Sequence, residues 1–378
     1  MRKNLARYIY IPFVSLMGCV TPVEDYDPDS TQQILVVEGF IDDDFGPHEF
    51  EISFISPFAG IQEGGAKRVI DNAEVVIIDD LGNYTPLEAE TLFEDELFNA
   101  NPQGCTPAIN PRQASTNYFT PADFRAEAGR SYILEIVLIN GVTYRSTLQT
   151  LNEPVPIDEV ILQFVSFPSS NDLINTTGIE VFVTLQDPAE DENFYLWQID
   201  GIYRIETPPL ADPNFCCLYD PRDNLGTECW VTETDVNDII FASEDSRFNG
   251  TNTTQKAGFI EDDGNRFTST FVPSDKQYYV SVKQYSVSSD AFEFYSNLGV
   301  LSEINGEIFD PPPVSVPTNI FNINDPSERV IGVFGVRAKT TFGTFVNRNQ
   351  LLEIKDNNLC GDCRYSVNGE LEIPDVYR

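Results

Sequence analysis

A short motif near the N-terminus could support covalent attachment of lipid. Residues 16–19 read Leu-Met-Gly-Cys, with an aliphatic residue three places before Cys19 and a small residue directly before it. A basic start and a modest apolar run precede the motif, and the run is shorter than the roughly 20 apolar residues that cross a bilayer. This layout, a lipobox, predicts a lipoprotein signal peptide over residues 1–18. We expect the Cys19 thiol to take a diacylglyceryl group and its freed amine a third acyl chain, which together anchor the protein in outer-membrane lipid.

The remaining cysteines are candidates for disulfides, because an even count in an exported protein favours pairing in an oxidising compartment. The candidates are Cys105, Cys216, Cys217, Cys229, Cys360 and Cys363. Adjacent Cys216 and Cys217 should have different partners, because a ring between neighbours is strained. Two less favoured alternatives are a thioredoxin-like role for Cys360 and Cys363, and a zinc site that adds Cys216 and Cys229 to them.

Residues that could perform catalysis are scarce. The chain has a single histidine, His48, which follows Gly46-Pro47 beside an expected strand start, and we interpret it as a solvated turn residue. No phosphate-binding loop or dinucleotide fingerprint is present, and nothing marks two of the 60 acidic residues as a catalytic pair. We therefore assign no catalytic residue and expect that the protein is not an enzyme. A hydrolase of extracellular polymer is the least favoured alternative.

Two acidic runs could bind calcium, a hard cation that takes oxygen ligands. They are residues 42–44 and 187–193. Neither has the spacing of a known calcium loop, so we interpret both as solvated turns. We assign no metal site and no cofactor, with calcium as the alternative.

The chain as a whole is strongly acidic, with 23 Lys and Arg residues against 60 Asp and Glu residues and a formal net charge of -37 at pH 7. Such a field repels nucleic acid, so we expect no nucleic-acid partner. Residues 19–32 are acidic and contain prolines, and we interpret them as an extended tether. An acidic cluster directly behind a lipidated cysteine also resembles the surface-export signals of Bacteroidota lipoproteins. This resemblance implies an outer-membrane protein that faces the extracellular side.

The elements that must position these residues are mainly strands. Alternating polarity and turn signals predict strands over 34–40, 49–55, 73–79, 131–138 and 142–148. Asn140-Gly141 predicts a hairpin turn between the last two. Strands at this spacing predict a β-sandwich over residues 33–152, with a long irregular insertion at 93–127. The Asp-x-Gly turn at 80–82 and the Ala-Gly-x-x-Tyr-x-Leu motif at 128–134 resemble those of immunoglobulin-like and transthyretin-like modules, and the resemblance implies a sandwich of that kind.

Prolines at 154 and 156 interrupt strand pairing and mark the start of a second, β-rich domain over residues 153–378. Its predicted elements are strands over 178–185, 193–205, 278–285 and 330–337 and one short helix over 289–304, and 206–265 reads as loop-rich. Four aromatic residues are candidates for an open ligand-binding face, although we expect the first three in the core: Tyr195, Trp197, Tyr203 and Trp230.

Several short motifs occur in a fixed order along the chain. They include Leu35-Val36-Val37-Glu38-Gly39, Pro154-x-Pro156-Ile157-Asp158, Ser288-x-x-Ala-Phe-Glu-Phe-Tyr, Gly306-Glu307-Ile308-Phe309-Asp310 and Cys360-Gly361-Asp362-Cys363. Together with the lipobox, this order resembles the Bacteroidota lipoprotein family catalogued as domain of unknown function 4249, from about residue 33 to the end. Members tend to be encoded beside SusC-like TonB-dependent transporters, and the family has no known catalytic residues. The resemblance implies an accessory role at the cell surface.

We therefore expect a non-catalytic accessory subunit of a SusC-like, TonB-dependent transport complex, which helps to capture or gate a ligand. We expect the surface that binds the β-barrel to include the helix near 289–304 and the segment after it, where Phe309 could act as an aromatic anchor beside a pre-ordered proline run. That run is Pro311, Pro312 and Pro313. The alternative for these segments is internal packing. The alternative function is a free-standing surface adhesin or glycan-binding lipoprotein.

Overall fold

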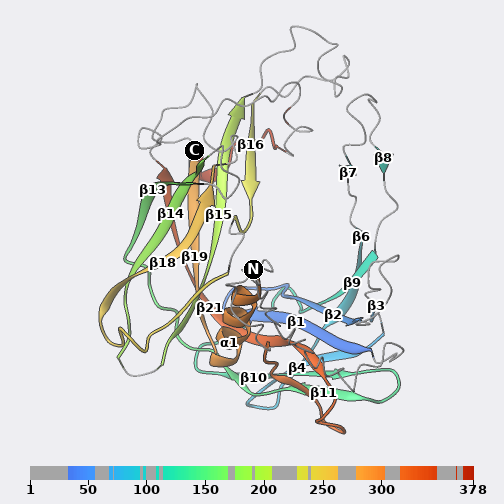
Figure 1. The fold of residues 1–378 in the computed structure, drawn as a ribbon. Coiled ribbons are helices and arrows are strands. Elements are labelled where there is room, and N and C mark those ends of the chain that lie inside the picture. The colour runs from blue at the N-terminus through green and yellow to red at the C-terminus, as the bar shows by residue number, and fades with distance from the viewer. Residues whose placement is uncertain are drawn as a thin grey trace, which may run out of the picture.

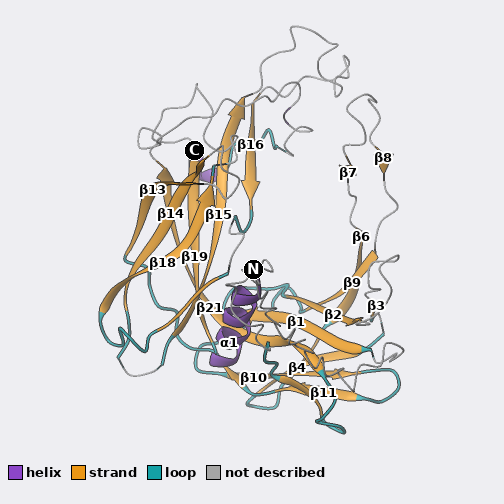
Figure 2. Ribbon diagram, in the orientation of Figure 1, coloured by secondary structure: helices purple, strands orange, loops and turns teal. Residues whose placement is uncertain are grey.

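The structure is a computed structural model in which strands dominate (Figure 2). It describes residues 33–55, 68–70, 72–93, 97–98, 108–109, 114–168, 175–189, 192–206, 228–236, 240–262, 278–302, 316–346, 363 and 369–378. Within these ranges the strands form three larger sheets and one two-stranded hairpin of β7 (Leu97–Phe98) and β8 (Ala108–Ile109), and there is one α-helix. The prediction of a mainly β fold with one short helix is confirmed.

The first sandwich packs one half of the largest sheet against a smaller sheet. The strands from the largest sheet are β1 (Ile34–Asp42), β2 (Glu49–Ile55), β9 (Ala114–Phe119) and β6 (Glu88–Phe93) in that order, with β3 (Arg68–Val69) beside β2. The smaller sheet runs β20 (Ile320–Asn322), β11 (Thr143–Ser146), β10 (Ser131–Val137), β4 (Glu74–Asp79) and β5 (Tyr84–Pro86), with β12 (Gln149–Thr150) beside β10. Alternate residues of the inner strands, such as Val37 of β1 and Leu134 of β10, fill the core between the sheets.

The second sandwich packs the other half of the largest sheet against a three-stranded sheet. The large-sheet strands are β16 (Glu228–Glu233), β15 (Phe194–Glu206), β19 (Tyr278–Val287) and β21 (Val330–Val346), with β17 (Phe241–Glu244) also beside β15. The facing strands are β13 (Glu159–Pro168), β14 (Asn175–Gln186) and β18 (Asn252–Glu261). Val181, Ile199 and Val282 are among the buried residues of this second core.

One long strand, β21, belongs to both sandwiches (Figure 1). Residues 330–337 pair in parallel with β1, whereas residues 337–346 pair antiparallel with β19. Arg337 is the position where the two pairings meet, opposite Asp42 on one side and Val287 on the other. The C-terminal part of the chain therefore completes the first core, in which Phe334 is fully buried.

The helix α1 (Ser289–Ser302) packs on the outer face of the sheet at this junction (Figure 1). Its buried residues Ala291 and Phe294 contact a cluster that includes Val287 and Val333. The Ser288 hydroxyl accepts a hydrogen bond from the backbone N–H of Ala291 and so caps the N-terminus of the helix. The helix thus covers the region where the two halves of the large sheet join.

Two stretches that we interpreted as loops contain strands, and both interpretations are wrong. The range 206–265 holds β16, β17 and β18, and the range 93–127 holds β9, an inner strand of the largest sheet. Polar residues hide β9 and the first half of β18, so neither has the apolar alternation that predicts a strand. Hydrogen bonds to the neighbouring strands of the sheet hold both segments in extended conformation, although their own sequences do not have a strand pattern.

The proline-containing segment between the sandwiches is held on the large sheet. Val155 is buried, and its carbonyl oxygen accepts hydrogen bonds from Gln284 Nε2 at 2.8 Å and Thr340 Oγ1 at 3.0 Å. Its backbone N–H donates to Ser286 Oγ at 3.3 Å. These contacts fix the segment against β19 and β21.

Candidate functional site

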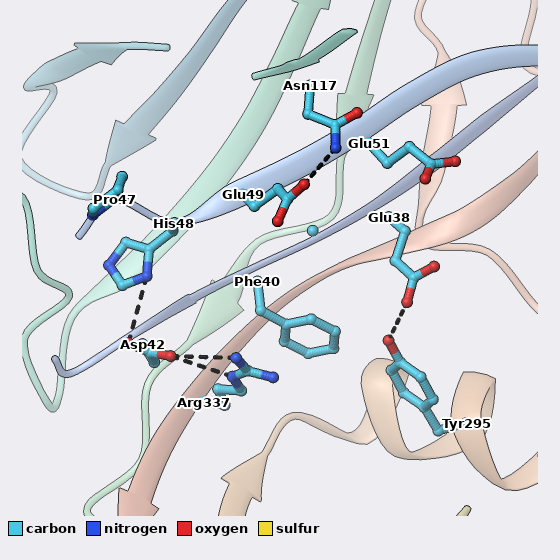
Figure 3. Close-up of a pocket in the computed structure, with 11 residues that line it drawn as sticks. Glu38, Phe40, Asp42, Pro47, His48, Glu49, Glu51, Asn117, Tyr295 and Arg337 are labelled. Carbon is cyan, nitrogen blue, oxygen red and sulfur yellow. Dashed lines mark hydrogen bonds and ion pairs between the residues drawn. The ribbon is translucent and has the colours of Figure 1, made fainter. Parts of the chain in front are cut away.

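A polar cavity of about 390 Å³ lies where β1, β2, β9, α1 and β21 come together (Figure 3). The residues with functional side chains around it are Glu38, Asp42, His48, Glu49, Glu51, Asn117, Tyr295 and Arg337. Phe40 forms an apolar part of the wall. Converging polar groups at a junction between two packed units are typical of ligand sites, so we treat this cavity as the candidate site.

Strand alternation brings the acidic residues to one face of the sheet. On β1, Val37 and Ile41 point into the first core, so Glu38 points to the outer face. The antiparallel register of β1 and β2 places Glu38 directly opposite Glu51. Glu49 lies two residues earlier on β2 and therefore shares that face.

Asn117 of β9 continues the same row across the sheet. It pairs in register with Glu51, and its Nδ2 donates a hydrogen bond to Glu49 Oε1. Asn117 is 7% exposed, and its Oδ1 has no hydrogen-bond partner among the described residues. Figure 3 shows the amide group between Glu49 and Glu51, with its nitrogen turned toward Glu49.

A chain of contacts through Asp42 closes one end of the cavity. His48 Nδ1 lies 3.4 Å from Asp42 Oδ1, and Arg337 Nη2 lies 3.3 Å from Asp42 Oδ2. The guanidinium carbon of Arg337 lies 4.9 Å from the ring centre of Phe40 and 4.3 Å from that of Tyr285. Arg337 therefore links the end of β1 to β19 at the crossover of β21.

His48 is buried, so the interpretation as a solvated turn residue is wrong. Its ring meets Phe124 edge to face with centroids 5.8 Å apart, and its backbone N–H donates to Thr120 Oγ1 at 2.8 Å. Both partners lie directly after β9, whose place beside β2 the sequence does not reveal. Loss of water lowers the pKa of His48 below its ordinary value, against the raising effect of Asp42. The imidazole is therefore neutral at pH 7.

The helix contributes Tyr295, whose hydroxyl donates to Glu38 Oε1 at 2.7 Å. Burial and then the negative charge of Glu38 raise the pKa of Tyr295 above its ordinary range. The phenol stays protonated and occupies one of the acceptor sites on Glu38.

The geometry around His48 differs from that of a hydrolase triad. In a triad, a carboxylate binds one ring nitrogen of histidine and a nucleophilic hydroxyl or thiol binds the other. Here Asp42 lies beside Nδ1, but Nε2 is buried and has no hydrogen-bond partner among the described residues.

The glutamates and Asn117 make the cavity wall rich in hydrogen-bond acceptors.

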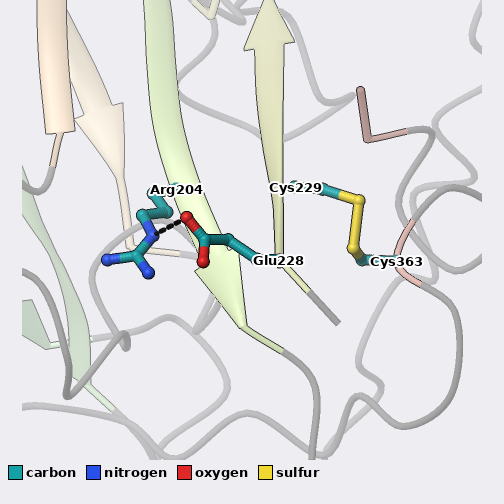
Figure 4. The surroundings of a disulfide bond; sticks show 4 residues. All are labelled: Arg204, Glu228, Cys229 and Cys363. Carbon is teal, nitrogen blue, oxygen red and sulfur yellow. Dashed lines mark ion pairs between the residues drawn. A yellow bond between two sulfur atoms is a disulfide. The ribbon is translucent and has the colours of Figure 1, made fainter. Parts of the chain in front are cut away.

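Most residues that the sequence singles out for lipid, disulfide or partner binding lie outside the described residues. They are Cys19, Cys105, Cys216, Cys217, Cys360, Phe309, Pro311, Pro312 and Pro313. The exceptions are Cys229 and Cys363, which form a disulfide with a Cα–Cα distance of 5.9 Å (Figure 4). In the structure Cys363 is thus bonded to Cys229 rather than to Cys360, and neither of the bonded sulfur atoms is a free thiolate that could bind zinc.

The disulfide ties the C-terminal segment to β16. Beside it, Trp230 and Glu370 exchange two backbone hydrogen bonds of 2.8 Å. On the neighbouring strand β15, Arg204 Nε lies 2.8 Å from Glu228 Oε1 (Figure 4). The end of the chain is therefore fixed to the edge of the second sandwich.

The four aromatic candidates are all buried, with exposed fractions between 0% and 7%. They are Tyr195, Trp197, Tyr203 and Trp230. The expectation of a core position is confirmed for the first three and extends to Trp230. These residues form no open face.

The acidic runs are also not simple solvated turns, because Asp42 is 8% exposed and Asp187 is 1% exposed. Asp43 accepts a hydrogen bond from the backbone N–H of Lys339, and Asp44 pairs with the Lys339 ammonium group. Asp187 accepts hydrogen bonds from the hydroxyl of Tyr195 at 2.6 Å and from the backbone N–H of Gly250 at 2.9 Å. The described ranges contain no group of three or more His, Cys, Asp or Glu residues that could hold a metal ion.

Sequence reasoning missed Asn117, Tyr295 and Arg337 as cavity residues. Asn117 lies in β9, within the range that the sequence predicts to be irregular, and Tyr295 lies in the predicted helix, where no motif marks it as a site residue. Arg337 is the last residue of a predicted strand and belongs to no motif. The parallel pairing of β1 with β21 is the feature that brings Arg337 to Asp42, and no local pattern predicts it.

None of the described helices has the length and apolar character needed to cross a membrane.

Comparison with known proteins places the chain in a family. No curated protein matches the chain. A family model described as Domain of unknown function (DUF4249) matches residues 21–342 of the 378. Because this match spans most of the sequence, the chain belongs to the DUF4249 family.

Proposed function

We propose that the protein is a non-catalytic lipoprotein on the surface of the outer membrane, where it serves as an accessory subunit of a SusC-like, TonB-dependent transporter. In this role it captures or gates a ligand. The observation that carries the proposal is the lipobox ending at Cys19, directly before an acidic stretch and a domain of the DUF4249 family. The anchor localises the folded part, and the transporter takes the ligand across the membrane.

The position of the first strand suits a tethered body. Chain geometry allows the residues between Cys19 and Ile34 to extend over at most about 50 Å. From Ile34 the chain enters β1, an inner strand between β21 and β2. A pull on the tether would therefore act on an inner strand of the largest sheet rather than on an edge strand.

Two further observations support an exported, non-catalytic protein. The disulfide of Cys229 and Cys363 is a bond that persists in oxidising compartments outside the cytoplasm. The buried His48 has no nucleophile hydrogen-bonded to its Nε2 among the described residues. The disulfide fits an exported protein, and the surroundings of His48 fit an accessory protein better than a hydrolase that uses histidine as its base.

The first test concerns the anchor. Without the thiol no lipid can be attached, so Cys19→Ala should release the protein from the membrane fraction. Metabolic labelling with a clickable fatty acid should mark the wild type and leave the variant unlabelled. Labelling of the variant would refute the lipoprotein assignment.

The second test concerns the transporter. Pull-down from detergent-solubilised outer membranes should recover a β-barrel protein with the wild type, through an interface on the order of 1,200–2,000 Å² or more. Replacement of Phe309 by serine and of Pro311, Pro312 and Pro313 by glycine should abolish recovery without lowering the melting temperature. A wild type that never recovers a barrel would favour the alternative of a free-standing adhesin or glycan-binding lipoprotein.

A further inference from the structure

The outer face of the first sandwich carries an uncommon row of side chains. Strand register places Glu38, Glu51, Asn117 and Glu90 side by side across β1, β2, β9 and β6. Like charges directly opposite one another in a sheet are unfavourable, and Glu38 and Glu51 are such a pair. The row therefore concentrates hydrogen-bond acceptors and negative charge on this face of the sheet.

The cavity at the α1 end of this row is negatively charged. Its charged residues are the carboxylates of Glu38, Asp42, Glu49 and Glu51 and the guanidinium group of Arg337. Arg337 is already bound to Asp42. The other charged groups of the wall are Glu38, Glu49 and Glu51, all of them acidic, and their field favours a cation in the cavity.

Buried Asn117 points to the kind of cation. Its Oδ1 is a hydrogen-bond acceptor that has no partner among the described residues, although the side chain is more than nine-tenths buried. Buried acceptors in native proteins are nearly always paired, and such an exception calls for an explanation. A ligand with several N–H donors could serve this oxygen together with the neighbouring carboxylates.

The cavity suits an organic cation better than a metal ion. The described residues include no group of three or more His, Cys, Asp or Glu that could hold a metal ion. The volume of about 390 Å³ falls within the range of small-molecule sites. Phe40 and Tyr295, whose ring centres lie 5.6 Å apart, give the wall an aromatic part for an alkyl chain or a cation.

We propose that this cavity binds an alkylammonium or guanidinium group, with N–H donors directed to Glu49, Glu51 and Asn117 Oδ1. The group could belong to a small amine or to a basic side chain of a polypeptide, since both present the same donors. The proposal goes beyond the proposed function, because the cavity depends neither on the lipid nor on a barrel.

The test uses the purified protein and measures binding by calorimetry and by NMR. The probes are butylguanidine, butylamine and the neutral isostere butylurea. The ring of His48 lines the cavity and belongs to the chain's single histidine, so its resonances report binding without an assignment problem. Butylguanidine and butylamine should bind and shift these resonances, and butylurea should not.

The variants separate charge from shape. The substitution Glu49→Gln removes the charge but keeps an oxygen that can accept the hydrogen bond from Asn117. It is combined with Glu51→Gln in a double variant. The double variant should weaken butylguanidine binding by about tenfold or more, because charge-assisted hydrogen bonds are lost. The matched control is Glu153→Gln with Glu159→Gln, two exposed sites outside the cavity with the same change of net charge. It should bind within about twofold of the wild type.

A second comparison identifies the source of the cation. Tighter binding of acetyl-Gly-Arg-Gly amide than of butylguanidine would indicate a polypeptide partner, and the reverse order a free amine. Three results would overturn the proposal. They are equal affinity of the wild type for butylurea and butylguanidine, unchanged butylguanidine affinity in the double variant, and no binding of either cationic probe at millimolar concentration. Should the double variant unfold, Glu49→Gln alone applies the same test. A cavity that responds to calcium and not to butylguanidine would also overturn it.

Discussion

The single histidine should make the protein less stable as the pH falls from 7.5 to 5.5. His48 is 7% exposed, and burial lowers its pKa in the folded protein below the value in the unfolded chain. The unfolded state therefore binds the proton first. The stability that depends on the neutral ring is complete above the unfolded pKa of about 6.5 and is lost as the pH falls through the folded pKa.

The size of the effect follows from the binding of one proton. If the native ring stays neutral down to pH 5.5, the unfolding free energy falls by about 1.4 kcal/mol between pH 7.5 and 5.5. The carboxylate of Asp42 works in the opposite direction by favouring the charged ring, and Arg337 works with burial against it. A drop of this size is therefore the upper bound for His48.

Urea denaturation across this pH range measures the drop, and His48→Asn supplies the reference. Asparagine has no proton to gain, and its amide can stand near the place of Nδ1 and donate to Asp42. Carboxylates that titrate at the acidic end contribute to both proteins and cancel in the difference. The wild type should lose stability more steeply than the variant, and the ring protons of His48 should titrate below pH 6.5 in the folded state. Equal slopes, or a folded-state pKa above that of the unfolded chain, would refute the reasoning.

Two predictions concern stability elsewhere in the fold. The double substitution Cys229→Ser and Cys363→Ser removes a cross-link between residues 134 positions apart. The chain-entropy model predicts that the unfolding free energy falls by about 5 kcal/mol, which urea denaturation measures. An unchanged denaturation midpoint would show that the disulfide contributes nothing to stability. Gly332→Ala should prevent folding or lower the melting temperature severely, because φ is 116° and a Cβ would lie 1.7 Å from the carbonyl oxygen of Val37. Its control, Gly82→Ala, has φ of 81° with no atom within 4 Å, so it should lose only about 1 kcal/mol; equal losses in the two variants would contradict this account.

The sequence alone was sufficient for features that depend on neighbouring residues. The strand over 49–55 was predicted with the bounds of β2, and the hairpin at Asn140-Gly141 joins β10 and β11 as expected. The helix begins at Ser289 behind its cap, as its local signals indicate. Each of these depends on periodicity, turn chemistry or capping within a few residues, so a short window contains the necessary information.

Tertiary structure decided which strands are neighbours and therefore what the cavity contains. Asp42 and Arg337 are 295 residues apart and meet because β21 pairs in parallel with β1. His48 is buried by residues that follow β9, a strand with too many polar residues to be recognised alone. A strand pattern states which face is apolar, but its partner is chosen by the packing of the whole sheet. For that reason the lipobox motif and several of the strands could be predicted from the sequence, whereas the acidic cavity at the junction of the two sandwiches could not.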